Sequence, residues 1–221
     1  MSSQIGVING SLLEKDILNP YAYRSYRSII RKVNNITGHI TIINEMYKKI
    51  IESLPTIEPD DENRLICSLQ DCCENIYSCM DYLSQVLRQV YKDIYRGVEL
   101  PDGFNDILKD VDKYEENPDE KKRPMYKNKI LRSYILKSRY WYQLVHDIRT
   151  EETHYGMGDL EIENDKVMYH NLKRSNRNGG KGKEKGEKEE KEIRFHISEI
   201  NGIYAEFCNY INELDKLILT I

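Results

Sequence analysis

Two long stretches of regularly spaced apolar residues constrain the fold of this chain more than any other feature. Apolar side chains recur every three or four positions from Tyr23 to Ile50, and again from Leu65 to Ile94. This spacing matches the 3.6-residue period of an amphipathic α-helix. Asn19-Pro20 supplies a cap and a first-turn proline for the first helix. Two such helices joined by a short loop predict an antiparallel hairpin.

The breaks around these helices also carry local signals. Leu54 to Asp61 contains two prolines and interrupts the pattern, and Asp60 or Asp61 is expected to cap the second helix, which runs from about Glu62 to Tyr95. A short amphipathic helix is expected over 104–114, followed by a charged, proline-bounded loop over 115–124. A third long helix then carries apolar residues from Ile130 to Ile148.

The chain changes character before its last helix. Residues 159–163 alternate apolar and polar side chains, Asn164-Asp165 offers a turn, and 166–170 resume, which predicts a small β-hairpin. Residues 193–197 are expected to return as a third short strand. Ser198 is expected to cap the final helix, whose apolar face extends to Ile218. The predicted fold is all-α, a bundle of four main helices with a small β-hairpin insertion before the last helix.

One domain accounts for most of the 221 residues. Residues 1–18 are expected to form an arm, and residues 19–221 a helical domain with a β insertion and a charged loop at about 157–197. Within that loop, residues 173–191 consist of Lys, Arg, Glu, Gly, Asn and Ser without one large apolar side chain, so they are expected to be flexible.

Composition narrows the classes of function. The formal net charge is −4, so any basic surface for nucleic acid must be local. No stretch is apolar enough to span a bilayer, and the first residues lack a signal-peptide pattern, which favours a cytoplasmic protein with no membrane partner. No P-loop, zinc-protease or Rossmann pattern occurs in the chain.

Four of the five cysteines crowd the second helix. Cys67, Cys72, Cys73 and Cys79 have no CxxC spacing and no nearby histidine in the sequence, so buried thiols in a reducing compartment are the simpler interpretation. A metal site is the alternative. We expect no metal and no cofactor.

Arg149 and His154 are the strongest candidates for chemistry. Arginine keeps its charge and can grip a phosphate with two hydrogen bonds, and histidine can transfer a proton near neutral pH. Within a continuous helix the two residues differ by about 140° in direction. They converge only if the helix ends or kinks between them, or if each faces the same seam between two subunits. Tyr155-Gly156-Met-Gly158 offers a stop within one turn of His154, so the two side chains could meet at a helix end.

The run Arg149-Thr-Glu-Glu-Thr-His154, preceded by Tyr142-Gln-Leu-Val-His-Asp-Ile, resembles the Arg-x4-6-His motif of the HEPN superfamily of helical nucleotide- and RNA-binding domains. The resemblance covers most of the chain from Pro20. It implies a metal-independent endoribonuclease of toxin or phage-defence type, in which two protomers bring their motifs together at a dimer cleft. It also implies RNA as substrate, a homodimer, and a nucleotidyltransferase-like antitoxin as a partner.

The same resemblance assigns roles to residues. Arg149 would hold the scissile phosphate and stabilise its developing charge, and His154 would act as general base or acid. Thr150 stands where the family often has Asn, Asp or His, and Tyr155 lies one position before the place, here Gly156, where one toxin branch has Tyr. Thr150, Glu151, His146 and Tyr155 are the supporting candidates, with His146 one turn before Arg149.

Basic residues after the motif are candidates for RNA contact, namely Lys173, Arg174 and Arg177. Glutamates interrupt the second half of this run, so a solvated loop is the alternative. For the whole chain two other hypotheses stay open. One is a non-catalytic HEPN module that binds a nucleotide or a partner protein. The other is a helical scaffold without a small-molecule site, in which Glu151 and Glu152 simply pair with Arg149.

Overall fold

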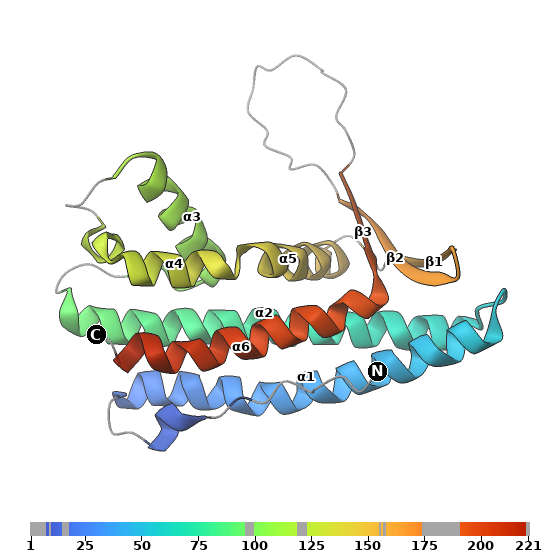
Figure 1. Ribbon diagram of the computed structural model, residues 1–221, viewed down its shortest axis with the longest axis horizontal. Coiled ribbons are helices and arrows are strands. Elements are labelled where there is room, and N and C mark those ends of the chain that lie inside the picture. Colours follow the sequence, from blue (N-terminus) through green and yellow to red (C-terminus); the bar gives the residue numbers. More distant parts are fainter. Residues whose placement is uncertain are drawn as a thin grey trace, which may run out of the picture.

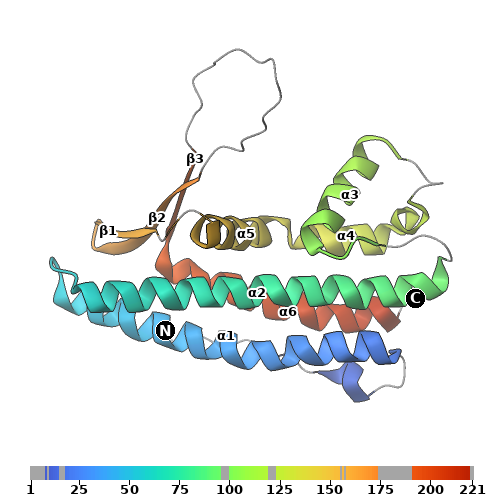
Figure 2. The same ribbon diagram turned by 180° about the vertical axis from the view of Figure 1, so that it is seen from behind.

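The computed structural model describes residues 8, 10–14, 18–95, 100–118, 123–154, 156, 158–173 and 191–219. Helix α1 (Pro20–Ser53) and helix α2 (Pro59–Ile94) form the predicted hairpin. The Asn19 side chain accepts hydrogen bonds from the backbone N–H groups of Tyr21 and Ala22 at 3.1 and 2.9 Å, as expected of a cap. Helix α6 (Ile200–Leu219) lies along this hairpin, in front of it in Figure 1 and behind it in Figure 2.

A set of shorter helices covers one side of these three long helices (Figure 1). It contains α3 (Phe104–Glu116), the 3₁₀ turn η2 (Pro124–Lys127), α4 (Lys129–Lys137) and α5 (Arg139–His154). Figure 2 shows from behind that α2 runs beneath α3, α4 and α5. The remaining described helical segments are the 3₁₀ turns η1 (Ser11–Glu14) and η3 (Ile197–Glu199). The coarse prediction of a mostly helical bundle is therefore confirmed.

The sheet is small and antiparallel, with strand order β1 (Asp159–Glu163), β2 (Lys166–Lys173) and β3 (Lys191–His196). Asn164 and Asp165 both have positive φ, 50° and 59°, which is the conformation of a two-residue hairpin turn that matches strand twist. Tyr169 pairs with Leu160 on one side and Phe195 on the other, and all three side chains are buried. The sheet lies beside the end of α5 (Figure 1).

An aromatic cluster holds α5 between its neighbours. Phe104 of α3 contacts Tyr142 edge-on at 5.1 Å between ring centroids, and Trp141 contacts Phe207 and Tyr210 of α6 at 6.1 and 5.7 Å. Trp141 and Tyr142 are adjacent in α5, so they face different neighbours on either side of the helix. The packing therefore fixes the rotation of α5 about its axis, and with it the direction of its later residues.

Several expected boundaries were wrong. Asp60 and Asp61 lie inside the first turn of α2, whose N-cap is Glu58, and Asp61 instead pairs with Lys49 at 2.7 Å. Asp60 and Asp61 suit that turn because acidic residues favour the positive end of a helix. The expected third long helix is broken at Ser138, whose buried hydroxyl donates to the Ile135 carbonyl at 2.9 Å. Such a bond competes with the regular helical ladder.

Two other ends also differ. Glu115 and Glu116 close α3 rather than opening the loop after it. The cap before the final helix is His196, whose ring nitrogen accepts from the Ser198 backbone N–H, while the Glu199 carboxylate accepts from the His196 backbone N–H at 3.3 Å. This reciprocal arrangement is a capping box, and it makes Ser198 part of the turn that it was expected to begin. Most of the segment expected to be flexible (174–190) and most of the arm over 1–18 lie outside the described residues, whereas its end residues Lys173 and Lys191 pair with each other in the sheet.

Candidate functional site

Arg149 lies near the end of α5, on the face that contacts α2. Its Nε donates to Glu74 Oε2 at 2.8 Å, and its guanidinium carbon lies 4.8 Å from the centre of the Tyr77 ring. The ion pair with Glu74 at Nε and the contact with the Tyr77 ring together restrict the orientation of the Arg149 guanidinium. The Arg149 side chain is still 28% exposed, so it is reachable from solvent.

Helical spacing brings the neighbours of Arg149 onto one strip. Tyr142, His146 and Arg149 follow one another at intervals of four and three on α5, and Glu74, Tyr77 and Asp81 do so at three and four on α2. The Tyr77 ring stacks on Tyr142 at 5.9 Å with an interplanar angle of 15°, and lies 5.8 Å from the His146 ring. The strip is therefore a row of aromatic rings with charged residues at both ends.

Acidic groups dominate the electrostatics of this strip. The hydrogen bond from Arg149 to Glu74 raises the pKa of Arg149, so its charge is permanent. Burial raises the pKa of the Asp81 carboxyl, against the lowering effects of the Phe104 backbone N–H, which it accepts at 3.1 Å, and of the Arg149 charge. Burial likewise raises the pKa of Tyr77. Asp81 thus carries a desolvated charge and caps the first turn of α3.

His154 is the last residue of α5, so Arg149 and His154 belong to one unbroken helix. Positions 149 and 154 are about 140° apart around the helix axis, and no break separates them. The helix ends just after His154, where the Gly156 N–H donates to the Glu151 carbonyl at 3.2 Å and Gly156 adopts a φ of 131°. Such a bond back across five residues is typical of a glycine-terminated helix. Gly156 therefore ends the helix as expected, but after both residues of the motif.

The supporting candidates lie in different settings. His146 is half-buried among Tyr77, Tyr142 and Asp147, with its Nδ1 3.5 Å from Asp147 Oδ1. Thr150 is half-buried, and Glu151 is only 4% exposed, so Glu151 is not part of a solvated helix end. Tyr155, Arg174 and Arg177 lie outside the described residues, and Lys173 is the last residue of β2.

Sequence reasoning missed Glu74, Tyr77 and Asp81. All three lie on α2, about seventy residues before the motif, and nothing in the motif points to them. One signal was available, since they form a polar strip at helical spacing beside the apolar stripe of α2. That pattern identifies a second contacting face but not its partner.

This arrangement can bind an anion, because it holds a permanently charged guanidinium at a partly exposed position. Among the described residues no group of three or more His, Cys, Asp or Glu side chains could hold a metal ion. All five cysteines are free thiols, and only Cys67 is exposed. In the described part of the chain no helix is long and apolar enough to cross a membrane. No protein-family model, curated protein or solved structure matches the chain.

Proposed function

We propose that this protein is a metal-independent endoribonuclease of the HEPN type, with a composite active site formed at the cleft of a homodimer. The observation that carries the proposal is the constrained, partly exposed guanidinium of Arg149 on the helix that ends with His154. In this scheme Arg149 binds the scissile phosphate, and its charge stabilises the transition state. His154 transfers the proton of the attacking ribose 2′-hydroxyl or of the leaving oxygen.

The rotation of α5 supports a site made by two protomers. Because Arg149 and His154 differ by about 140° around one helix, a phosphate gripped by Arg149 is poorly placed for His154 of the same chain. A two-fold axis beside α5 would let each phosphate meet Arg149 of one protomer and His154 of the other. The activity is then expected to disappear with the dimer. A nucleotidyltransferase-like antitoxin is the proposed regulator.

Glu74 sets a condition on substrate binding. Its carboxylate already occupies the Arg149 Nε, so a phosphate must share the guanidinium or displace Glu74. Both side chains of the pair are partly exposed, 28% for Arg149 and 44% for Glu74, and exposed pairs contribute only about 0.2–1 kcal/mol. A phosphate can therefore compete with Glu74 at modest cost.

A second candidate function follows from the same ion pair. If Arg149 remains bound to Glu74, the strip serves packing between α2 and α5, and the protein is a non-catalytic HEPN module that binds a nucleotide or a partner protein. The stacked Tyr77 and Tyr142 rings favour this interpretation, because they make the interface around Arg149 well packed.

Cleavage assays on purified variants separate the two candidates. Arg149→Ala and His154→Ala should each lower cleavage of single-stranded RNA by about 10²–10⁴-fold. Arg139→Ala is the matched control, because Arg139 is an exposed arginine of the same helix paired with Asp112. Activity should survive a chelator, leave 2′,3′-cyclic phosphate or 3′-phosphate ends, and spare DNA.

Helical circular dichroism and sedimentation should be unchanged in all three variants. Cleavage that persists in folded Arg149→Ala and His154→Ala, or that requires added magnesium, would contradict the ribonuclease mechanism. A wild-type protein that is monomeric at micromolar concentration with and without RNA would contradict the composite site.

A further inference from the structure

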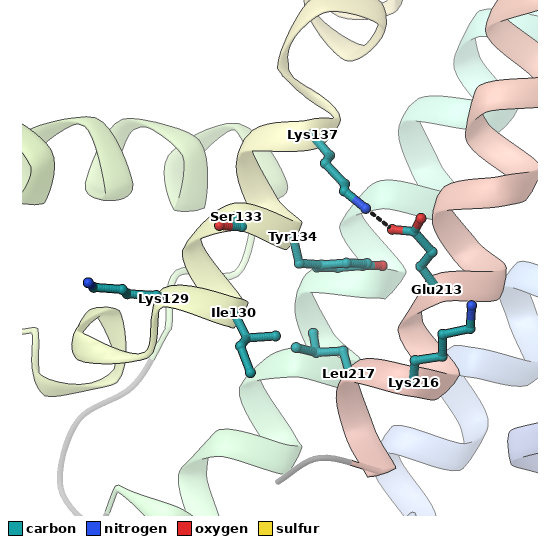
Figure 3. A pocket seen from close by; sticks show the side chains of 8 residues that line it. All are labelled: Lys129, Ile130, Ser133, Tyr134, Lys137, Glu213, Lys216 and Leu217. Atoms are coloured by element: carbon teal, nitrogen blue, oxygen red, sulfur yellow. Dashed lines mark hydrogen bonds and ion pairs between the residues drawn. The ribbon is translucent and has the colours of Figure 1, made fainter.

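A cavity of about 510 Å³ lies between α4 and α6, and it shares no residue with the Arg149 strip (Figure 3). Its volume falls within the range of about 300–1,000 Å³ that is usual for small-molecule pockets. The aromatic cluster that packs α5 against α6 does not extend to its outer part, where Ile130 of α4 is 59% exposed. Ile130 therefore contributes accessible apolar surface to the lining of the cavity, as small-molecule pockets generally have.

The floor of the cavity is aliphatic rather than aromatic. Ile130 and Leu217 extend toward each other from α4 and α6 (Figure 3). Tyr134 also lines the cavity, but its ring is stacked on Tyr210 at 4.3 Å and its hydroxyl donates to the Tyr210 carbonyl. One face of that ring is therefore already used. The aliphatic walls suit an alkyl chain better than a flat ring that needs an aromatic partner.

The rim carries an excess of positive charge, although the whole chain has a net charge of −4. Three lysines and one glutamate line the cavity, and the two lysines beside Tyr134, Lys137 and Lys216, exceed Glu213 by one positive charge. Lys137 pairs with Glu213 at 2.6 Å, whereas Lys216 has no ion-pair partner within 4 Å among the described residues. Lys137, Glu213 and Lys216 lie on one side of Tyr134, and Lys129 points away from Ile130 and Leu217 (Figure 3).

We propose that this cavity binds a medium-chain aliphatic carboxylate. The alkyl chain lies between Ile130 and Leu217, and the carboxylate lies beside Lys216 and Lys137, where it competes with Glu213 for the Lys137 ammonium group. The proposal combines two observations on the same cavity, an aliphatic wall made by the exposed Ile130 and the buried Leu217, and a basic rim that Glu213 only partly neutralises. It is independent of the ribonuclease activity proposed above.

Calorimetric titration of the full-length protein with decanoate, below its micellar concentration, tests the site. Decanoate should bind at one site per chain, and octanoate should bind about three- to fifteen-fold more weakly, because it loses two buried methylenes. Decyltrimethylammonium has the same chain and the opposite charge, and it should show no saturable binding. Equal affinity for the cationic and anionic probes would overturn the proposal.

Paired variants locate the binding. Ile130→Glu should abolish decanoate binding, whereas Leu219→Glu should not, because Leu219 is similarly exposed at 53% but does not line the cavity. Lys216→Glu should weaken binding by about tenfold or more, and Lys48→Glu on α1 should leave it unchanged. Both residues of each pair are exposed, so all four variants should fold. Equal loss within either pair, or no loss in Ile130→Glu, would place decanoate elsewhere and refute the assignment.

Discussion

Replacing Glu74 by Gln separates its two conceivable roles at Arg149. The amide is nearly isosteric, and its oxygen can still accept the hydrogen bond that Arg149 Nε now gives to the carboxylate at 2.8 Å. The substitution therefore removes the charge and keeps the packing. If Glu74 competes with a phosphate, the variant should bind RNA more tightly. If Glu74 mainly positions the guanidinium, the variant should bind RNA no better or less well.

The size of the effect follows from the exposure of the pair. With Glu74 44% exposed, solvent screening limits the ion pair to about 0.5–1 kcal/mol. The free energy of unfolding should fall by no more than that, which corresponds to a drop in Tm of at most about 2–4 °C in a chain of this size. In Glu74→Gln a phosphate no longer has to break this ion pair in order to bind Arg149, so RNA affinity should rise about two- to fivefold. Stability and affinity thus change in opposite directions.

Fluorescence anisotropy of a labelled single-stranded RNA measures the affinity, in a His154→Ala background that prevents cleavage. Glu52→Gln is the control for net charge, because Glu52 is exposed on α1 and pairs with Lys48. Any gain shared by Glu74→Gln and Glu52→Gln reports long-range electrostatics, which added salt should screen. A decrease in RNA affinity specific to Glu74→Gln would refute the competition and identify Glu74 as a positioning residue.

Three further predictions concern the framework of the site. Gly158→Ala should destabilise the protein by about 1–3 kcal/mol in urea unfolding, because the new Cβ would lie 2.6 Å from both the His170 carbonyl oxygen and the Tyr169 ring. Gly202→Ala in α6 has open space around the new Cβ and should stabilise the protein by about 0.5–1 kcal/mol. Stability changes of the same sign in both variants would contradict these contacts. Burial raises the pKa of Asp81, so the free energy of unfolding should fall as pH rises from the unfolded pKa of about 3.9 through the higher folded pKa. Asp81→Asn should therefore have a higher Tm than the wild type at pH 7 but not below pH of about 3.5. Asp81→Ala should be about 1 kcal/mol less stable than Asp81→Asn, because the Phe104 N–H loses its acceptor. Thiol titration of the native protein at pH 8 should label Cys67 rapidly and the other cysteines only after unfolding. The other cysteines are buried, and burial raises the pKa of Cys79 to about 12 and of Cys208 to about 11. Fast labelling of more than one thiol would show that the core opens.

Apolar periodicity was sufficient to predict the helices, because a buried stripe on a long helix must repeat at 3.6 residues whatever its partner is. It could not predict where the third long helix breaks. Ser138 has an ordinary helix propensity, and its local hydrogen bond to the Ile135 carbonyl is similar to bonds that Thr37 and Thr41 make inside the unbroken α1, so its residue type does not mark the break. The N-cap at His196 could not be predicted from the sequence either, because histidine is not among the usual capping residues and here accepts the hydrogen bond through a ring nitrogen.

In the candidate site too, the residues defined by local sequence spacing could be predicted, and those brought in by tertiary contacts could not. Arg149 and His154 were identifiable because their spacing along the chain is itself the signal. Glu74 and Tyr77 were not, because they meet Arg149 only after α2 and α5 pack together. The packing nevertheless follows from residues that are easy to recognise: Val145 and Ile148 are fully buried, and Arg149 is the residue that immediately follows them at the edge of that stripe. A charged residue at the edge of a buried stripe is held close to the neighbouring helix while its head group can still reach solvent. The apolar face that stabilises α5 thus also determines which residue of the motif faces α2, and an alteration of that face should misplace Arg149 without touching it.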